Sequence, residues 1–191
     1  RGATFAALGD FNSDSDLYLQ DYEVLGELRL LSGHNTLTLN FANGSTGTGY
    51  DRQSNELIPS RLVRGGAAML RVRGRNIGLP ATQNCARVFF SQTAPTNDLV
   101  SGGGAPDTTT VGIIPWMIGD ASASGSGNTF VTYDLRTQDD GSDVIGLRPL
   151  NTTTEFASSL GAGGSNDNVR LTGNQILSAV ARINALCVQG G

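Results

Sequence analysis

The chain has 191 residues, a formal net charge of −4 and 38% hydrophobic residues, enough to bury the core of one domain. All 13 basic residues are arginine, so lysine-dependent chemistry such as Schiff-base formation or a P-loop is excluded. The negative net charge argues against a nucleic acid as the main partner. A charged fraction of 16% and 26 glycines favour short strands joined by polar loops over a helical protein.

Residues 1–9 are predicted to form an extended N-terminal arm, and an acidic loop follows it. Carboxylate or amide side chains occupy every second position from Asp10 to Asp16, namely Asp10, Asn12, Asp14 and Asp16, and Asp21 takes the twelfth position of the loop. The spacing resembles the DxNxD loop of EF-hands and the calcium loops of integrin-type and dockerin-type repeats. The resemblance implies a calcium site, because hard cations bind several converging oxygen ligands. The alternative is a solvated loop whose carboxylates accept hydrogen bonds from nearby backbone N–H groups.

Residues 22–41 show the clearest secondary-structure pattern in the chain. Apolar and polar residues alternate over 22–30 and again over 36–41, which is the two-residue period of a half-buried strand. Turn-forming residues, Ser32-Gly33-His34-Asn35, separate the two runs. The pattern predicts a β-hairpin. A hairpin alone is only marginally stable, so we expect other strands to cover its apolar face.

Further short strands are predicted over 67–75, 87–90, 111–116, 129–135 and 144–150. Their number and spacing favour one all-β domain over residues 1–191, built as a β-sandwich and including the jelly-roll type. No repeat with the period of a solenoid or propeller is recognised.

The C-terminal region departs from this strand pattern. Thr172 and Gln175 have the spacing of a capping box. Apolar residues then recur at helical intervals: Ile176, Leu177, Val180, Ile183 and Cys187. One amphipathic helix is therefore predicted over about 174–187, packed on the sheet.

Five of the 13 arginines lie between positions 61 and 75: Arg61, Arg64, Arg71, Arg73 and Arg75. They could pair with the acidic N-terminal region within the fold, or with another subunit in a head-to-tail assembly. An anionic polysaccharide or a nucleic acid could also bind this face, although no aromatic residues interleave with the arginines, as base stacking would require. A solvated strand face is the remaining interpretation.

Two cysteines, Cys85 and Cys187, are candidates for a disulfide. A bridge would close a loop of about 100 residues and stabilise the fold by up to roughly 4–5 kcal/mol. The alternative is a pair of free thiols. The sequence shows no signal peptide and no apolar run long enough to cross a membrane.

Residues for catalysis are few. His34 is the only histidine and falls in the predicted turn, whereas a Ser-His-Asp site needs a buried, oriented base. Glu23 and Glu27 share one strand face instead of facing each other across a cleft, as glycoside hydrolysis requires. We therefore predict no catalytic residue, and an enzyme is disfavoured.

Three functions remain as expectations. The first is a structural subunit of an extracellular or viral assembly, of filament, surface-layer or capsid type, whose partner is the chain itself. The second is a secreted carbohydrate-binding or adhesion module in which calcium orders the loop at 10–21 and a glycan is the partner. The third, and least favoured, is a hydrolase that uses carboxylates. The first two place the protein outside the cell or in a virion.

Overall fold

The computed structural model describes residues 4–9, 18–41, 52–79, 85–100, 103–137, 144–162, 164–176 and 179–189. These residues form eleven strands and one short 3-10 turn, η1 (Pro95–Asp98). The predicted all-β class is therefore confirmed. Among the described residues, no helix has the length and hydropathy that a membrane crossing requires.

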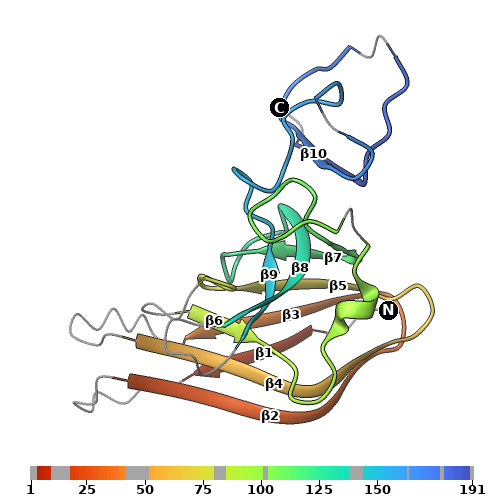
Figure 1. The fold of residues 1–191 in the computed structure, drawn as a ribbon. Helices are drawn as coiled ribbons and strands as arrows, with labels where there is room; N and C mark the ends of the chain where they lie inside the picture. Colours follow the sequence, from red (N-terminus) through yellow and green to blue (C-terminus); the bar gives the residue numbers. More distant parts are fainter. Residues whose placement is uncertain are drawn as a thin grey trace.

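The chain alternates between two sheets (Figure 1). The larger sheet contains β1 (Thr4–Gly9), β3 (His34–Phe41), β5 (Met69–Gly74), β7 (Ile114–Asp120), β8 (Thr129–Thr137) and β9 (Val144–Pro149), in that order. The second sheet contains β2 (Tyr18–Leu30), β4 (Arg52–Arg64) and β6 (Cys85–Val88). Each turn of the chain thus adds one strand to each sheet, which is the arrangement of a β-solenoid. The predicted N-terminal arm includes β1, which pairs with β3 along its whole length.

The strands from β1 to β7 pair in parallel, one turn of the chain apart. Registered partners are separated by 31 residues in Ser54–Cys85 and by 35 in His34–Met69. The interval grows to 47 in Leu70–Met117, because residues 89–113 lie between those turns. No repeat of solenoid period is visible in the sequence, although the strands stack turn on turn. Stacked positions share a side-chain direction but seldom a residue type, so the repeat leaves little trace in the sequence.

The predicted hairpin at 22–41 is also wrong. Its two strands, β2 and β3, belong to different sheets, and the turn between them is a corner where Gly33 adopts a positive φ of 72°. The next corner stacks on this one: the Gly65 N–H donates to the Leu30 carbonyl at 2.6 Å and the Met69 N–H to the Gly33 carbonyl at 2.8 Å. Residue alternation therefore located the strands correctly but did not specify their partners.

The main core lies between the two sheets. Its fully buried side chains come from both of them and include Leu37, Leu57 and Met117. On β5, Leu70 and Val72 point inward, while Arg71 and Arg73 point outward. On β2 the prediction fails near the start of the strand, because Tyr22 and Val24 are 59% and 62% exposed.

One end of the stack is closed by the antiparallel strands β8 and β9. The Phe90 N–H, just after β6, donates to the Tyr133 hydroxyl of β8 at 3.2 Å. Gly146 of β9 lies close enough to the Val88 carbonyl that a Cβ atom there would be 2.2 Å from its oxygen. A jelly roll pairs its strands antiparallel, whereas among the described strands of the two main sheets only the pairs β7–β8 and β8–β9 are antiparallel.

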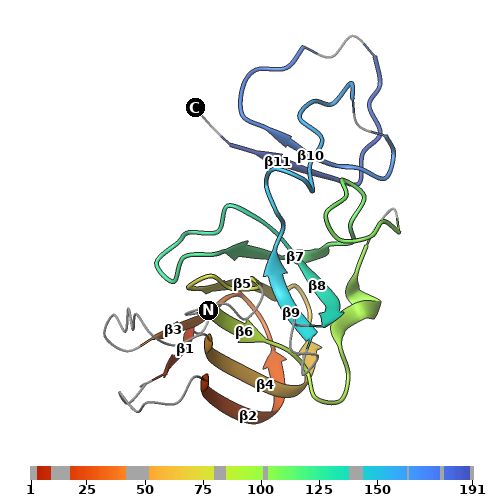
Figure 2. The ribbon, with the colours of Figure 1, turned by 60° about the vertical axis from the view of Figure 1, so that its left-hand side comes forward.

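Beyond β9, β10 (Asn168–Leu171) and β11 (Ala185–Val188) form a small parallel sheet at the top of Figure 1; Figure 2 shows both strands. A second core cluster contains Val111, Ile113, Leu150 and Phe156. The helix predicted over 174–187 does not form in the described residues of that range, 174–176 and 179–187. Ile176 and Val180 are 97% and 92% exposed. Because these residues have no apolar surface to cover, the helical spacing gains no stability from packing.

Candidate functional site

The proposed calcium loop lies mostly outside the described residues, which exclude Asp10, Asn12, Asp14 and Asp16. Asp21 lies in β2, opposite Asn55 of β4, and its side chain is not described. Within the described part of the chain, no group of three or more His, Cys, Asp or Glu side chains could hold a metal ion. The calcium site therefore stays a prediction.

The first turn of the solenoid leaves the long strand β2 at the edge of its sheet. β2 has 13 residues and pairs with β4 on one side, and among the described residues no strand pairs with its other side. Every second residue of a parallel strand directs its N–H and C=O toward the same neighbour. The free side of β2 therefore presents a row of backbone groups that another strand could pair with.

Acidic and basic segments meet at one point along the β2–β4 pair. Glu27 of β2 stands opposite Arg61 of β4 in register, and the two side chains form an ion pair. Arg29 contacts the same carboxylate at 2.8 Å. Hydrogen bonding from Arg61 outweighs a small effect of burial and lowers the pKa of Glu27. Pairing between these two segments within one chain is thus observed for Glu27.

The other predicted arginines have different partners. Arg64 donates to the Ala68 carbonyl at 2.8 Å, and its guanidinium lies 5.0 Å from the centre of the Trp116 ring. Arg71 and Arg73 donate to the hydroxyls of Thr36 and Thr38 at 3.1 and 2.9 Å. They also reach two backbone carbonyls of the loop after β7, as described below.

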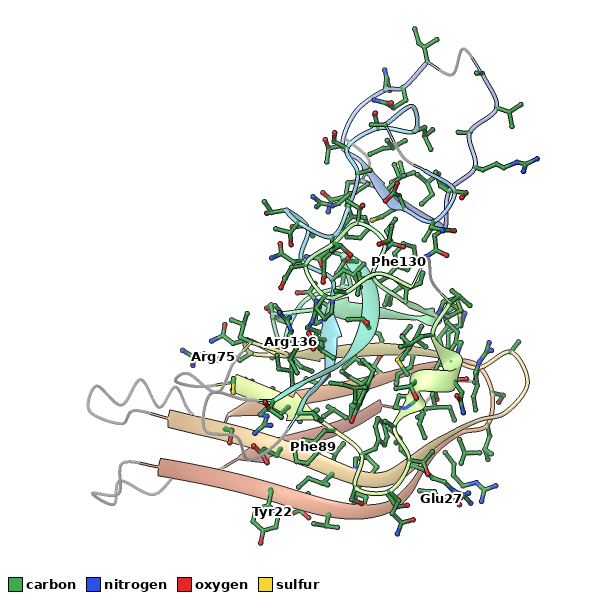
Figure 3. All side chains as sticks on the ribbon, viewed as in Figure 1. Tyr22, Glu27, Arg75, Phe89, Phe130 and Arg136 are labelled. Carbon is green, nitrogen blue, oxygen red and sulfur yellow. The ribbon has the colours of Figure 1, made fainter. Side chains whose placement is uncertain are left out.

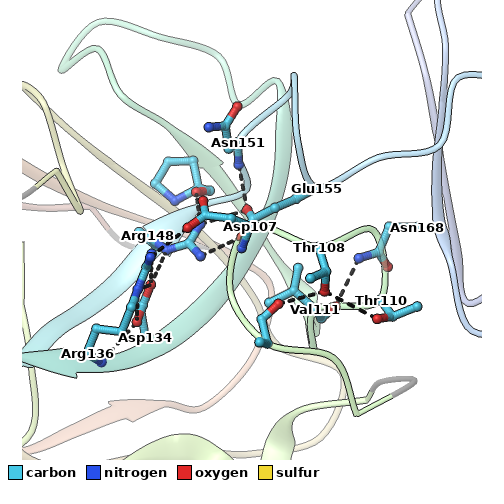
Figure 4. A network of polar contacts seen from close by, with 12 residues as sticks. Asp107, Thr108, Thr110, Val111, Asp134, Arg136, Arg148, Asn151, Glu155 and Asn168 are labelled. Atoms are coloured by element: carbon cyan, nitrogen blue, oxygen red, sulfur yellow. Dashed lines mark hydrogen bonds and ion pairs between the residues drawn. The ribbon is translucent and has the colours of Figure 1, made fainter.

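Figure 4 shows a partly buried ion-pair network on the closing strands, which the sequence analysis did not identify. Arg148 of β9 contacts Glu155 through both Nη atoms, at 2.7 and 2.6 Å, and Asp134 of β8 through Nε at 2.7 Å. Arg136 contacts Asp134 at 2.7 Å and Asp107 at 2.6 Å. Glu155 also accepts the N–H groups of Asp107 and Asn151, at 2.8 and 2.7 Å.

These contacts keep Asp134 ionised and Arg148 protonated. Burial alone would raise the pKa of Asp134, but hydrogen bonds from Arg136 and Arg148 hold that pKa below its ordinary value. Burial would likewise lower the pKa of Arg148, yet its bonds to Glu155 and Asp134 raise it. A carboxylate held ionised and occupied by donors is a poor general acid. The network therefore joins β8, β9 and two loops instead of forming an acid–base pair.

A signal for this network does exist in the sequence. Asp134 and Arg148 each interrupt an apolar strand, and a charge in such a position needs a buried partner.

An open cavity of about 830 Å³ lies beside the network, lined by Ile77, Asp120, Thr129, Arg136 and Asn151 among others. The Thr129 hydroxyl is buried and has no hydrogen-bond partner among the described residues.

The remaining candidate residues are not brought together. Cys85 is buried in β6 and Cys187 lies in β11 of the C-terminal sheet, and both are free thiols. His34 is exposed at the start of β3. Trp116 and Tyr133, considered for a sugar-binding face, are buried in the main core.

Comparisons with protein-family models, with curated proteins and with solved structures gave no match.

Proposed function

We propose that the chain is a structural subunit of an extracellular or viral assembly, held to its neighbours through the free edge of β2. The observation that carries the proposal is the asymmetry of the stack. One end is closed by the antiparallel strands β8 and β9, and the other presents a 13-residue strand with an unpaired side among the described residues. A long free edge of this kind pairs readily with a strand of another chain.

The exposed side chains of β2 support the same proposal. Tyr22 and Val24 lie at the free edge and are more than half exposed, and aromatic and β-branched residues stabilise cross-strand pairs. The arginine row on β5 contributes nothing to the proposal, because among the described residues none of its members forms an ion pair with a carboxylate.

Calcium is proposed as a stabiliser of this contact. The acidic segment at 10–21 leads directly into β2, so a cation held there would order the beginning of the free edge. The same placement makes the calcium site and the contact testable together.

The alternatives have weaker support. A sugar-binding module loses two residues that could form its aromatic platform, since Trp116 and Tyr133 are in the core. A hydrolase lacks a free carboxylate pair there, since Asp134 and Glu155 are bound by arginines.

The test is the mass of the native particle in solution, measured by light scattering over a range of concentrations, with calcium and then with a chelator. The proposal predicts a species of several subunits, and dissociation in chelator would place calcium at the contact. A monomer of 19.9 kDa at every concentration would refute self-assembly.

A further inference from the structure

Three arginines form a row on the outer face of the larger sheet. Arg71, Arg73 and the adjacent Arg75 alternate with the inward-facing Leu70, Val72 and Gly74 of β5. Residues two apart on a strand are about 6.6 Å apart, so the row presents positive charge at regular intervals. Figure 3 shows Arg75 at the margin of the sheet.

The charge of this row is not balanced in the way that several other arginines are balanced. Arg61, Arg87, Arg136 and Arg148 each contact a carboxylate at ion-pair distance. Among the described residues, no carboxylate lies within that distance of the row, and the Nε of Arg71 is buried without a partner. Like charges this close repel one another. The positive charge of the row is therefore not balanced by a carboxylate among the described residues, and a bound anion would balance it.

The nearest acidic residue is already engaged. Asp120 of β7 stands opposite Arg73 in register, but its carboxylate accepts the N–H groups of Ser122 and Gly127, at 3.0 and 3.2 Å. Its charge is directed at the backbone of the loop that follows β7. That loop is held over the row in turn, because Arg73 donates to the Gly125 carbonyl at 2.9 Å and Arg71 to the Ser126 carbonyl at 3.4 Å.

A hollow of about 390 Å³ lies at the end of the row, lined by Asn40, Arg75, Ala121, Ser122, Ala123 and Ser124. The Arg75 carbonyl accepts the Ala86 N–H at 2.8 Å, but the Arg75 guanidinium forms no hydrogen bond or ion pair with any described residue. The hydroxyls of Ser122 and Ser124 are 3.2 Å apart, so one of them retains a donor for a third group. A guanidinium beside hydroxyl and amide donors matches the geometry of a carboxylate or sulfate.

We propose that the hollow at the end of this row binds an acidic polysaccharide, with one carboxylate or sulfate group seated against Arg75, Ser122 and Ser124. The positive charge of Arg71 and Arg73 beside the hollow adds attraction for a polyanion. None of the residues lining the hollow is aromatic, so bases of a nucleic acid would find nothing to stack on. The inference does not depend on self-assembly through β2.

The test is titration calorimetry of the full chain with an oligogalacturonate, with heparin as a sulfated probe, neutral dextran and a thymidine oligonucleotide. Binding of either acidic glycan, weakened by salt, with no response to dextran, is expected; a response to heparin alone would assign a sulfate. Arg75→Gln should reduce the affinity by about tenfold, whereas Arg182→Gln, which removes an exposed charge from the C-terminal part, should change it less than twofold. Equal losses in the two variants, tighter binding of the oligonucleotide, or no binding of either glycan would overturn the proposal.

Discussion

Arg148 and Glu155 form a two-point ion pair that is closed to solvent. The guanidinium donates to both carboxylate oxygens, at 2.7 and 2.6 Å, and both side chains are buried. Glu155 lies in the loop that follows β9, and Arg148 lies in β9. The ion pair therefore holds this loop against the closing strand. The closed end of the stack thus depends on a charge interaction as well as on apolar packing.

Glu155→Gln should destabilise the fold by about 2–3 kcal/mol, because it removes one of the two carboxylates that balance the buried Arg148 and leaves only Asp134. Urea unfolding followed by tryptophan fluorescence measures the change, since Trp116 is buried in the main core. Asp107→Asn is the matched control, as the Arg136–Asp107 pair is half exposed. It should cost no more than about 1 kcal/mol. Equal losses of unfolding free energy in the two variants would contradict a larger contribution from the buried Arg148–Glu155 pair.

Asp134 should make stability depend on pH in the acid range. Its pKa in the folded protein is lowered from an ordinary value of 3.8, so its contribution is fully present above about pH 4 and is lost as the pH falls through the folded value. The difference in unfolding free energy between the wild type and Asp134→Asn should therefore be constant from neutral pH down to about pH 4 and shrink below it. A difference that does not change with pH would contradict the ion pairs with Arg136 and Arg148.

The two cysteines should react differently with thiol reagents. Burial, partly offset by the nearby Arg87, raises the pKa of Cys85 to about 11, so its thiolate is scarce and shielded at pH 8. Cys187 is partly exposed. Native protein should label at one thiol and urea-unfolded protein at two, without a reductant. One or no thiol in the unfolded protein would instead indicate a disulfide.

Gly146→Ala should destabilise the closed end. Gly146 has a φ of +82°, and a Cβ atom there would lie 2.2 Å from the Val88 carbonyl oxygen. The backbone strain and the clash should together cost at least about 2 kcal/mol in urea unfolding. Gly26→Ala is the control, because a Cβ at that position meets no atom within 4 Å. Similar stability of the two variants would mean that β9 does not approach β6 this closely.

Local pattern was enough to predict the all-β class and most strands. It did not identify partners, because a strand's alternation is the same whether it pairs with the next strand or with one a full turn away. Glu27 and Arg61 illustrate this: they are 34 residues apart and stand opposite each other.

The buried network was missed for a related reason. Asp134, Arg148 and Glu155 come from two strands and a loop, and only the antiparallel closure of β8 on β9 brings them together. The C-terminal helix was predicted from spacing alone, but Ile176 and Val180 have no surface to pack on. In the structure, Ala185–Val188 pairs with β10 instead.

The most direct test of the proposed assembly compares Val24→Lys with Val188→Lys. The two valines are 62% and 66% exposed, but only Val24 lies on the free edge of β2, where a lysine opposes strand pairing. Light scattering should show that Val24→Lys reduces the wild-type particle to a monomer of 19.9 kDa, while Val188→Lys leaves its mass unchanged. An unchanged particle in Val24→Lys, or dissociation in Val188→Lys alone, would contradict assembly through β2.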